Sequence, residues 1–327
     1  MSVAGNLPYH LRQNKAIDRN LFVDLLQRVG RYRNISDFQY VGFGGPYLED
    51  HKLMHGALRL RQLVSLEKRG EVVKRQRFNQ PVSGMTLHEM TSGDYLTKFD
   101  FEQPSIVWFD YTEPKSLGLQ LGEIELLVRK LNAGDVFKIT LNAAPEALGR
   151  PTDPSTDLLD FRLERFRERA GSYCPSAVDA DSVTTANYPK NLLKAIESAA
   201  KHGLDTKPRC VLMPLTAFVY ADGQQMLTAT AIVLEKVDLD KFGAESRLGS
   251  WPFHSRDWAD LRSISVPQLS IKERILVESL LPDETDVEAV FASLGFEIGP
   301  TPDEARLQMQ NFMHYYRLYP WYSRVVL

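Results

Sequence analysis

The chain has 327 residues, of which 43% are hydrophobic and 25% charged, a balance that excludes a disordered or fibrous protein and predicts a large buried core. Lys and Arg number 39 against 42 Asp and Glu, so the formal net charge is -3 and a nucleic-acid partner would need a local basic patch. The two cysteines, Cys174 and Cys210, have no paired spacing, which disfavours a disulfide framework and a cysteine zinc site.

Targeting and membrane segments are not indicated. No window approaches 18 consecutive apolar residues, and the first eight residues contain no apolar core of signal-peptide length. The sequence therefore predicts a cytoplasmic protein that does not span a membrane.

Short apolar runs alternate with amphipathic stretches from about residue 17 to residue 236. The runs predict strands at 38–42, 63–67, 85–90, 106–110, 136–141, 211–220 and 227–235. The amphipathic stretches predict helices at 17–29, 71–78, 117–131, 157–169 and 191–201. This alternation is typical of an α/β protein with a mostly parallel sheet.

The last two predicted strands break the alternation, because residues 220–224 (Tyr-Ala-Asp-Gly-Gln) are typical of a hairpin turn. We therefore expect a seven-stranded sheet that ends in an antiparallel hairpin. Beyond residue 236, predicted helices at 270–281, 286–294 and 303–316 indicate a small helical C-terminal subdomain. The expected domains are 1–236 and 237–327.

Glycines cluster where the first predicted strand ends. Residues 42–46 read Gly-Phe-Gly-Gly-Pro, and backbone without a Cβ can approach a small-molecule ligand closely. Tyr47 stands where a dinucleotide fingerprint needs its last glycine. A tight strand-to-helix turn without a ligand is the alternative.

Acidic residues follow the next two predicted strands. Glu67, with Lys68 beside it, is placed to accept hydrogen bonds from ribose hydroxyls. Asp94 and Tyr95 follow the third strand in a segment that resembles the methyltransferase segment whose Asp accepts from the adenine amino group, with a neighbouring side chain packed on the base. A solvated glutamate and a plain Ser-Gly-Asp turn are the respective alternatives.

The fourth predicted strand runs directly into Asp110, Tyr111 and Glu113. Ligands in open α/β sheets bind beyond the carboxyl ends of the strands, so these side chains should face a reacting centre. We expect Asp110 to orient the acceptor group of a substrate or to act as a general base, and Tyr111 to line the pocket.

In this order, the segments resemble the class I S-adenosylmethionine-dependent methyltransferases over about residues 15–236. Residues 11–15, 42–50 and 65–67 also resemble bacterial O-methyltransferase-like proteins. The resemblance implies a Rossmann-like fold, S-adenosylmethionine as cofactor, and methyl transfer to an oxygen of an unidentified substrate. It implies catalytic roles for Asp110, Tyr111 and Glu113, and cofactor contacts from Gly42, Phe43, Gly44, Gly45, Glu67, Lys68, Asp94 and Tyr95, with Arg12 or Lys15 pairing with the methionine carboxylate.

The chain departs from the family pattern at two positions. Tyr40 stands where the family usually has an acidic residue, and Pro46 where glycine is common. A catalytically silent module that binds a protein or nucleic acid is therefore one alternative. An NAD(P)-dependent oxidoreductase is a second, which the terminal hairpin and the missing glycine disfavour.

No metal site is expected. Asp110 and Asn142 resemble the oxygen ligands of metal-assisted catechol-type methyltransferases, but Leu141 replaces their further acidic ligand. His51 and His55 share a helical face without a third ligand.

An aromatic and basic segment at 312–324 could bind single-stranded nucleic acid. Packing on the core or in a homo-oligomer interface is the favoured interpretation, because Tyr, Trp and Arg are enriched at such surfaces.

Overall fold

The structure is a computed structural model that describes residues 12–320, so the predictions for the first eight residues and for 321–324 lie outside the described residues. It divides into two compact units, which we describe separately. The larger unit comprises 22–219 and 224–262, and the described part of the smaller unit comprises 12–21, 220–223 and 263–320. Residue 236, the predicted boundary, falls inside the larger unit, and the assignment of separate functions to 1–236 and 237–327 stays a prediction.

Eight strands form one sheet in the order β3-β2-β1-β4-β5-β7-β6-β8. Strands β1 to β5 pair in parallel, and β7 pairs antiparallel with β5, which confirms the mostly parallel sheet with an antiparallel end. The bounds are β1 (Gln39–Phe43), β2 (Gln62–Leu66), β3 (Thr86–His88), β4 (Ser105–Asp110), β5 (Val136–Asn142), β6 (Cys210–Asp222), β7 (Gln224–Glu235) and β8 (Arg262–Ile264). The predicted count of seven missed β8, because three residues are too few to show a period-two pattern.

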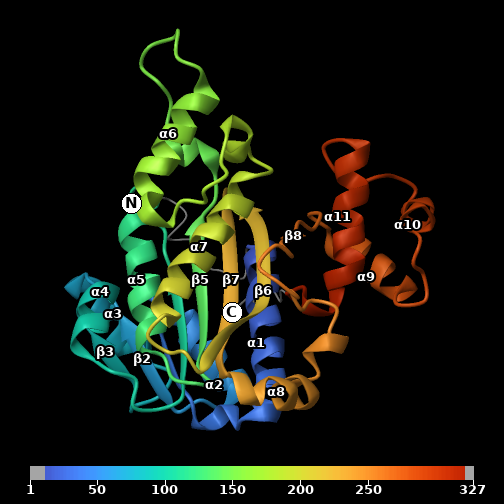
Figure 1. Cartoon of the computed structure of the whole chain (residues 1–327). Coiled ribbons are helices and arrows are strands. Elements are labelled where there is room, and N and C mark those ends of the chain that lie inside the picture. Colours follow the sequence, from blue (N-terminus) through green and yellow to red (C-terminus); the bar gives the residue numbers. More distant parts are fainter. Residues whose placement is uncertain (1–11, 321–327) are drawn as a thin grey trace. The chain divides into compact units, whose positions relative to one another are not determined.

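Helices precede, connect and follow these strands along the described chain (Figure 1). They are α1 (Gln13–Tyr32), α2 (Glu49–Leu58), α3 (Gly70–Asn79), α4 (Ser92–Lys98), α5 (Leu117–Lys130), α6 (Leu158–Ala170), α7 (Tyr188–Leu204), α8 (Leu239–Ser246), α9 (Ile271–Leu280), α10 (Val287–Leu294) and α11 (Pro302–Tyr315). Short 3-10 helices are η3 (Ile35–Asp37), η4 (Pro114–Ser116), η5 (Pro145–Leu148), η6 (Gly171–Tyr173), η7 (Ala180–Val183), η8 (Lys236–Asp238), η9 (Leu248–Ser250) and η10 (Tyr316–Leu318). Helix α8 was not predicted, and neither was α4, whose first residues suggested a turn.

Both faces of the sheet in the larger unit are covered. Helices α5 and α7 pack on one face (Figure 1), and α5 buries Leu121, Ile124 and Val128 at helical spacing against the side chains of β4 and β5. On the other face, the ring of Phe22 from α1 meets Trp108 of β4 edge-on, with 5.4 Å between centroids. Since side chains alternate along a strand, this two-sided cover decides which layer each residue at a strand end faces.

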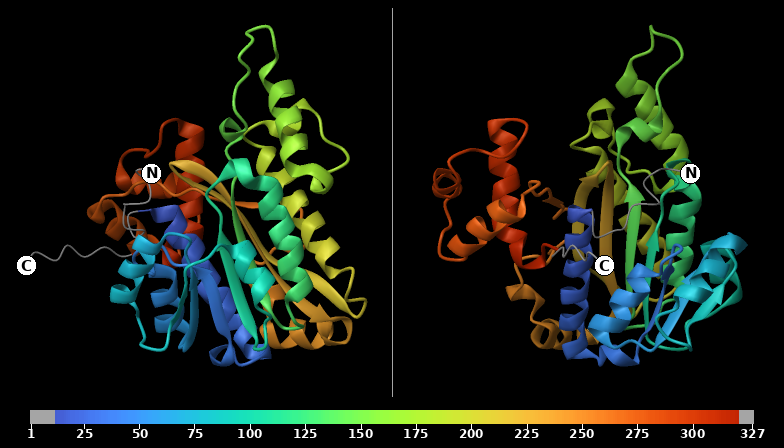
Figure 2. Two further views of the ribbon diagram at one scale, coloured as in Figure 1. Left: turned by 90° about the vertical axis from the view of Figure 1, so that its left-hand side faces the viewer. Right: turned by 180° about the vertical axis from the view of Figure 1, so that it is seen from behind.

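Helices α9, α10 and α11 lie together in the smaller unit (Figure 2). The predicted caps are present, because Ser270 and Glu273 form a capping box and Thr301 accepts from the backbone N–H of Glu304. Phe312 and Tyr319 are buried with 5.3 Å between ring centroids, so the described part of the aromatic segment packs within this unit. Among residues 12–320, no helix has the length and apolar composition needed to cross a membrane.

Candidate functional site

The carboxyl ends of neighbouring strands bring most of the predicted site residues of the larger unit to one edge of the sheet. Phe43 at the end of β1 pairs with Leu66 of β2, so Gly44 lies beside Glu67. Gly42 pairs with Trp108 of β4, so Asp110 reaches the level of Gly44 on the other side. The parallel register therefore brings the glycine turn between two carboxylates, as ligand binding at strand ends requires.

The three glycines are needed for different reasons. A Cβ on Gly42 would lie 2.8 Å from the hydroxyl oxygen of Tyr40, and one on Gly44 would overlap Leu48 and lie 2.6 Å from Oγ of Ser65. Gly45 has a φ of 49°, and no atom lies within 4 Å of the position its Cβ would take. Close packing inside the protein thus explains Gly42 and Gly44, whereas Gly45 is required by backbone conformation and leaves open space beside the turn.

Two buried polar side chains hold this turn in place. The side-chain amide of Gln76 on α3 donates to the carbonyl oxygen of Gly45 at 2.8 Å, and its own carbonyl accepts from Ser65 at 3.3 Å. Gln76 and Ser65 are both fully buried. Sequence reasoning missed them, because neither residue belongs to a ligand motif and their contact joins two elements.

Glu67 is half-buried directly after β2 and has one carboxylate oxygen engaged. Its Oε1 accepts from the backbone N–H of Arg69 at 3.0 Å and from the Arg69 guanidinium at 3.3 Å. Within the described residues, no hydrogen bond reaches Oε2. Glu67 can therefore accept hydroxyl donors while Arg69 holds it in place, and the side chain of Lys68 beside it is exposed.

Asp94 lies in the first turn of α4, where Thr91 is the N-cap. The hydroxyl of Thr91 donates to Oδ2 of Asp94 at 2.8 Å and accepts from its backbone N–H at 3.1 Å. These hydrogen bonds lower the pKa of the Asp94 carboxyl, so it is an exposed anion. Tyr95 points inward and its ring stacks on Phe99 at 4.9 Å, which leaves little of it to cover an adenine.

Asp110 and Tyr111 face opposite sides of the sheet, although both were expected to face the acceptor. Strand alternation places Asp110 with Trp108 on the α1 side. Tyr111 continues the ladder by donating its N–H to the carbonyl of Thr140, and its hydroxyl lies 2.5 Å from Oε2 of Glu123 on α5. Asp110 thus lies at the carboxyl edge of the sheet on the α1 side, whereas the hydroxyl of Tyr111 is buried in the α5 layer.

Glu113 and Asn142 form local hydrogen bonds at the ends of β4 and β5. The Glu113 carboxylate is exposed and accepts from the backbone N–H of Lys115 at 3.4 Å, at the start of η4. The Asn142 amide donates to Gln224 of β7 at 2.9 Å and its carbonyl accepts from the N–H of Ala144 at 3.0 Å. In residues 12–320, no group of three His, Cys, Asp or Glu side chains could hold a metal ion.

The two histidines on α2 are bound to backbone. His51 is fully buried with its Nε2 3.0 Å from the carbonyl of Val64, and its ring meets Tyr40 edge-on at 4.9 Å. Burial lowers the pKa of His51 to about 4. His55 Nδ1 lies 2.8 Å from the carbonyl of Leu60, so both rings have structural contacts.

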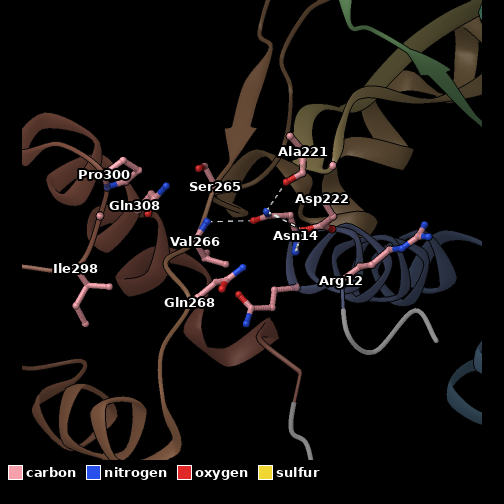
Figure 3. A pocket seen from close by; sticks show the side chains of 13 residues that line it. Arg12, Asn14, Ala221, Asp222, Ser265, Val266, Gln268, Ile298, Pro300 and Gln308 are labelled. Atoms are coloured by element: carbon pink, nitrogen blue, oxygen red, sulfur yellow. Dashed lines mark hydrogen bonds between the residues drawn. The ribbon is translucent and has the colours of Figure 1, made fainter. Parts of the chain in front are cut away.

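Arg12 and Lys15 belong to the smaller unit, and their predicted pairing with the cofactor carboxylate stays a prediction. This unit has a cavity of about 620 Å³, lined by the start of α1, the tip of the β6–β7 hairpin and residues near β8 and α11 (Figure 3). Asn14 donates to the carbonyl of Ala221 at 3.0 Å and accepts from the N–H of Val266 at 3.0 Å (Figure 3). Asp222 accepts from the backbone N–H of Lys15 at 2.8 Å and therefore caps α1.

Comparison with solved structures finds methyltransferases of low similarity. The N-methyltransferase NodS from Bradyrhizobium japonicum WM9 shares 10% identity at a TM-score of 0.38, covering 67% of this chain and 97% of that one. An O-methyltransferase from Bacillus cereus in complex with SAH shares 12% identity at a TM-score of 0.37, covering 70% and 86%. Trm1 from Pyrococcus horikoshii with S-adenosyl-L-methionine shares 10% identity at a TM-score of 0.45, covering 70% and 57%.

Comparison of the sequence with known families and proteins gives two results. No curated protein matches the chain. A family model described as "Putative O-methyltransferase" matches residues 7–327, nearly the whole chain, and confirms the methyltransferase predicted from the glycine turn and the acidic residues that follow it. The chain belongs to this O-methyltransferase family.

Proposed function

We propose that the protein transfers a methyl group from S-adenosylmethionine to an oxygen atom of its substrate. The observation that supports this most is the register that brings Gly44, Glu67 and Asp110 to adjoining strand ends, in a chain of the O-methyltransferase family. A cytoplasmic location and a homo-oligomer remain expectations from the sequence.

The turn at 42–45 and the two carboxylates beyond β2 and β3 fit an adenosine-containing cofactor. The open space beside Gly45 accepts a ligand against bare backbone. The second oxygen of Glu67 is available to ribose hydroxyls, and the exposed carboxylate of Asp94 can accept from an adenine amino group. S-adenosylmethionine supplies a methyl group bonded to a positively charged sulfur.

Asp110 is the residue we assign to the acceptor. As the new C–O bond forms and the S–C bond breaks, an acceptor hydroxyl must lose its proton, and a carboxylate at the strand end can take it. Most of the acceleration comes from holding the acceptor oxygen in line with the methyl carbon and from excluding water, so Asp110 also orients the hydroxyl. Tyr111 is not assigned to the acceptor, because its hydroxyl donates to Glu123 in the α5 layer.

Isothermal titration with S-adenosylhomocysteine tests the cofactor assignment. We expect saturable binding, and no heat at millimolar ligand would overturn the proposal. Asp110→Asn should leave this affinity within about twofold and lower the rate of methyl transfer by about 10²–10⁴-fold, the usual size of a general-base contribution. Glu113→Gln is the matched control, because Glu113 follows the same strand but its carboxylate accepts from local backbone. A joint loss of affinity and rate in Asp110→Asn would contradict its assignment to the acceptor.

A silent binding module is the second candidate, and Tyr40 is the observation that favours it. Its hydroxyl oxygen lies 2.8 Å from the position of a Cβ on Gly42, so an aromatic ring reaches the glycine turn where the family usually has a carboxylate. Binding of S-adenosylhomocysteine without turnover of S-adenosylmethionine in any cell extract would support this function instead.

A further inference from the structure

One carboxylate joins two segments at the carboxyl edge of the sheet. Oε2 of Glu123 on α5 accepts hydrogen bonds from the hydroxyl of Ser92 at 2.6 Å and from the hydroxyl of Tyr111 at 2.5 Å. Hydroxyl-to-carboxylate hydrogen bonds of this length are charge-assisted and among the stronger ones in proteins. No Lys or Arg forms an ion pair with Glu123 among the described residues, so these two hydroxyls are its hydrogen-bond partners there.

Both hydroxyls remain neutral donors. Tyr111 is buried, and burial together with the charge of Glu123 raises the pKa of its hydroxyl well above 10. Ser92 is buried as well. A carboxylate that accepts from two immobile donors is held in one position, and each donor is held by it in turn.

Gly93 allows this carboxylate to approach. A Cβ on Gly93 would lie 3.0 Å from Oε1 of Glu123, which is tighter than an ordinary carbon–oxygen contact. In the Ser92-Gly93-Asp94 segment, Ser92 therefore donates a hydrogen bond to Glu123, and Gly93 leaves room for its carboxylate. The remaining member, Asp94, keeps an exposed carboxylate.

The two segments joined in this way are distant within the sheet. Ser92 precedes Asp94 in the first turn of α4, which follows β3, and Tyr111 directly follows Asp110, the last residue of β4. Strands β2 and β1 lie between β3 and β4, so no direct strand pairing joins the two segments, which the sheet relates only through two intervening strands. The contact of both with Glu123 joins them through the helix layer.

We propose that Glu123 is a positioning residue of the methyl-transfer site. Through its hydrogen bonds with Ser92 and Tyr111, it holds the first turn of α4 and the end of β4 in fixed relative positions. The first turn of α4 presents Asp94 to the adenine, and the end of β4 presents Asp110 to the acceptor. This inference rests on the proposed function. In this proposal Glu123 acts through Asp94 and Asp110, the two carboxylates assigned to the cofactor and the acceptor.

Glu125 provides a matched control on the same helix. Its Oε2 accepts from the hydroxyl of Tyr173 at 2.7 Å, and Arg129 donates to its other oxygen. The Glu125–Tyr173 pair thus repeats the chemistry of the Glu123–Tyr111 pair away from the strand ends. Loss of a glutamate–tyrosine contact can therefore be compared at two places on one helix.

The test measures the affinity for S-adenosylhomocysteine by titration in the full-length protein. Glu123→Ala should weaken binding about tenfold, as expected for a lost charge-assisted hydrogen bond. Glu123→Gln retains one acceptor oxygen and should recover part of this loss, while Glu125→Gln should stay within about twofold of wild type. If Glu123→Ala does not fold, Tyr111→Phe removes one hydroxyl only and should weaken binding about threefold.

A double-mutant cycle separates positioning from general stability. Asp94→Asn should weaken binding clearly in the wild-type background and much less in Glu123→Ala, because the displaced turn no longer presents residue 94 to the adenine. Independent effects, or a folded Glu123→Ala with wild-type affinity, would overturn the inference and leave the proposed function intact. Absence of binding by the wild-type protein would overturn the proposed function itself and the inference with it.

Discussion

The side-chain amide of Gln76 reaches from α3 to the glycine turn and donates a hydrogen bond of 2.8 Å to the carbonyl oxygen of Gly45. Gln76→Met keeps the length of the side chain but leaves this carbonyl and the hydroxyl of Ser65 without their partner. We expect a loss of about 1–3 kcal/mol in the free energy of unfolding, the cost of unsatisfied buried polar groups, and weaker binding of S-adenosylhomocysteine. Urea unfolding and titration measure the two effects. Gln62→Met, at the exposed start of β2, is the control, and equal behaviour of the two variants would contradict the role of Gln76.

Gly44 and Gly45 should respond differently to alanine. Gly44→Ala overlaps Leu48 and crowds Ser65, so overpacking should cost about 1–3 kcal/mol of stability. Gly45→Ala meets no atom within 4 Å but places a Cβ in the left-handed region, at a cost of about 1–2 kcal/mol. In our proposal the ligand fills the space beside Gly45. For each kcal/mol of stability lost, Gly45→Ala should therefore lower the affinity for S-adenosylhomocysteine more than Gly44→Ala does. A larger affinity loss per kcal/mol in Gly44→Ala would place the ligand elsewhere.

Asp222 should stabilise the start of α1. Its carboxylate accepts from the backbone N–H of Lys15 and from Asn14, across more than 200 residues of chain. Asp222→Ala removes a helix cap, which costs about 0.5–2 kcal/mol, and should speed hydrogen exchange at the amides of the first turn. Asp205→Ala, an exposed residue after α7, serves as control. Unchanged exchange at residues 14 and 15 would show that water can replace the Asp222 carboxylate.

His51 should make the protein less stable as the pH falls. Burial lowers its pKa to about 4, against about 6.5 in the unfolded chain, so between these values the unfolded state binds more protons. The contribution of His51 to the free energy of unfolding is therefore complete above pH 6.5. It is lost as the pH falls toward 4, by roughly 3 kcal/mol in total. His51→Gln should lack this part of the pH dependence in urea unfolding between pH 4 and 7. An identical slope in the variant would assign the titration to another group.

Asp135 should have the opposite effect. Burial raises its pKa to about 6 although two backbone N–H groups donate to it, so between pH 4 and 6 the native state binds more protons than the unfolded chain. The contribution of Asp135 to the free energy of unfolding is complete below pH 4. It is lost as the pH rises through 6, by roughly 3 kcal/mol. Relative to wild type, Asp135→Asn should therefore gain stability with rising pH. The reverse trend would mean that the carboxylate is stabilised in the fold.

The succession of strands along the chain and the residue types at their ends could be predicted from the sequence, because both depend on local patterns. Alternating apolar runs marked seven of the eight strands, the Asp222-Gly223 turn marked the antiparallel end, and the glycines and acids after β1, β2 and β4 marked the ligand edge. Such signals need no knowledge of partners far along the chain. Strand β8 and helices α4 and α8 were missed, since short or weakly periodic segments depend on tertiary contacts.

Only the tertiary structure decided which polar side chains hold the site together. Gln76 supports the glycine turn, Glu123 joins Ser92 to Tyr111, and Asp222 caps α1, and each contact spans elements that the sequence leaves unrelated. The structure also separated Asp110 from Tyr111, because adjacent strand residues face opposite layers and only packed helices tell which layer is which. Local residue patterns thus determined which groups we assign to the cofactor and the acceptor, and long-range hydrogen bonding determined how those groups are held.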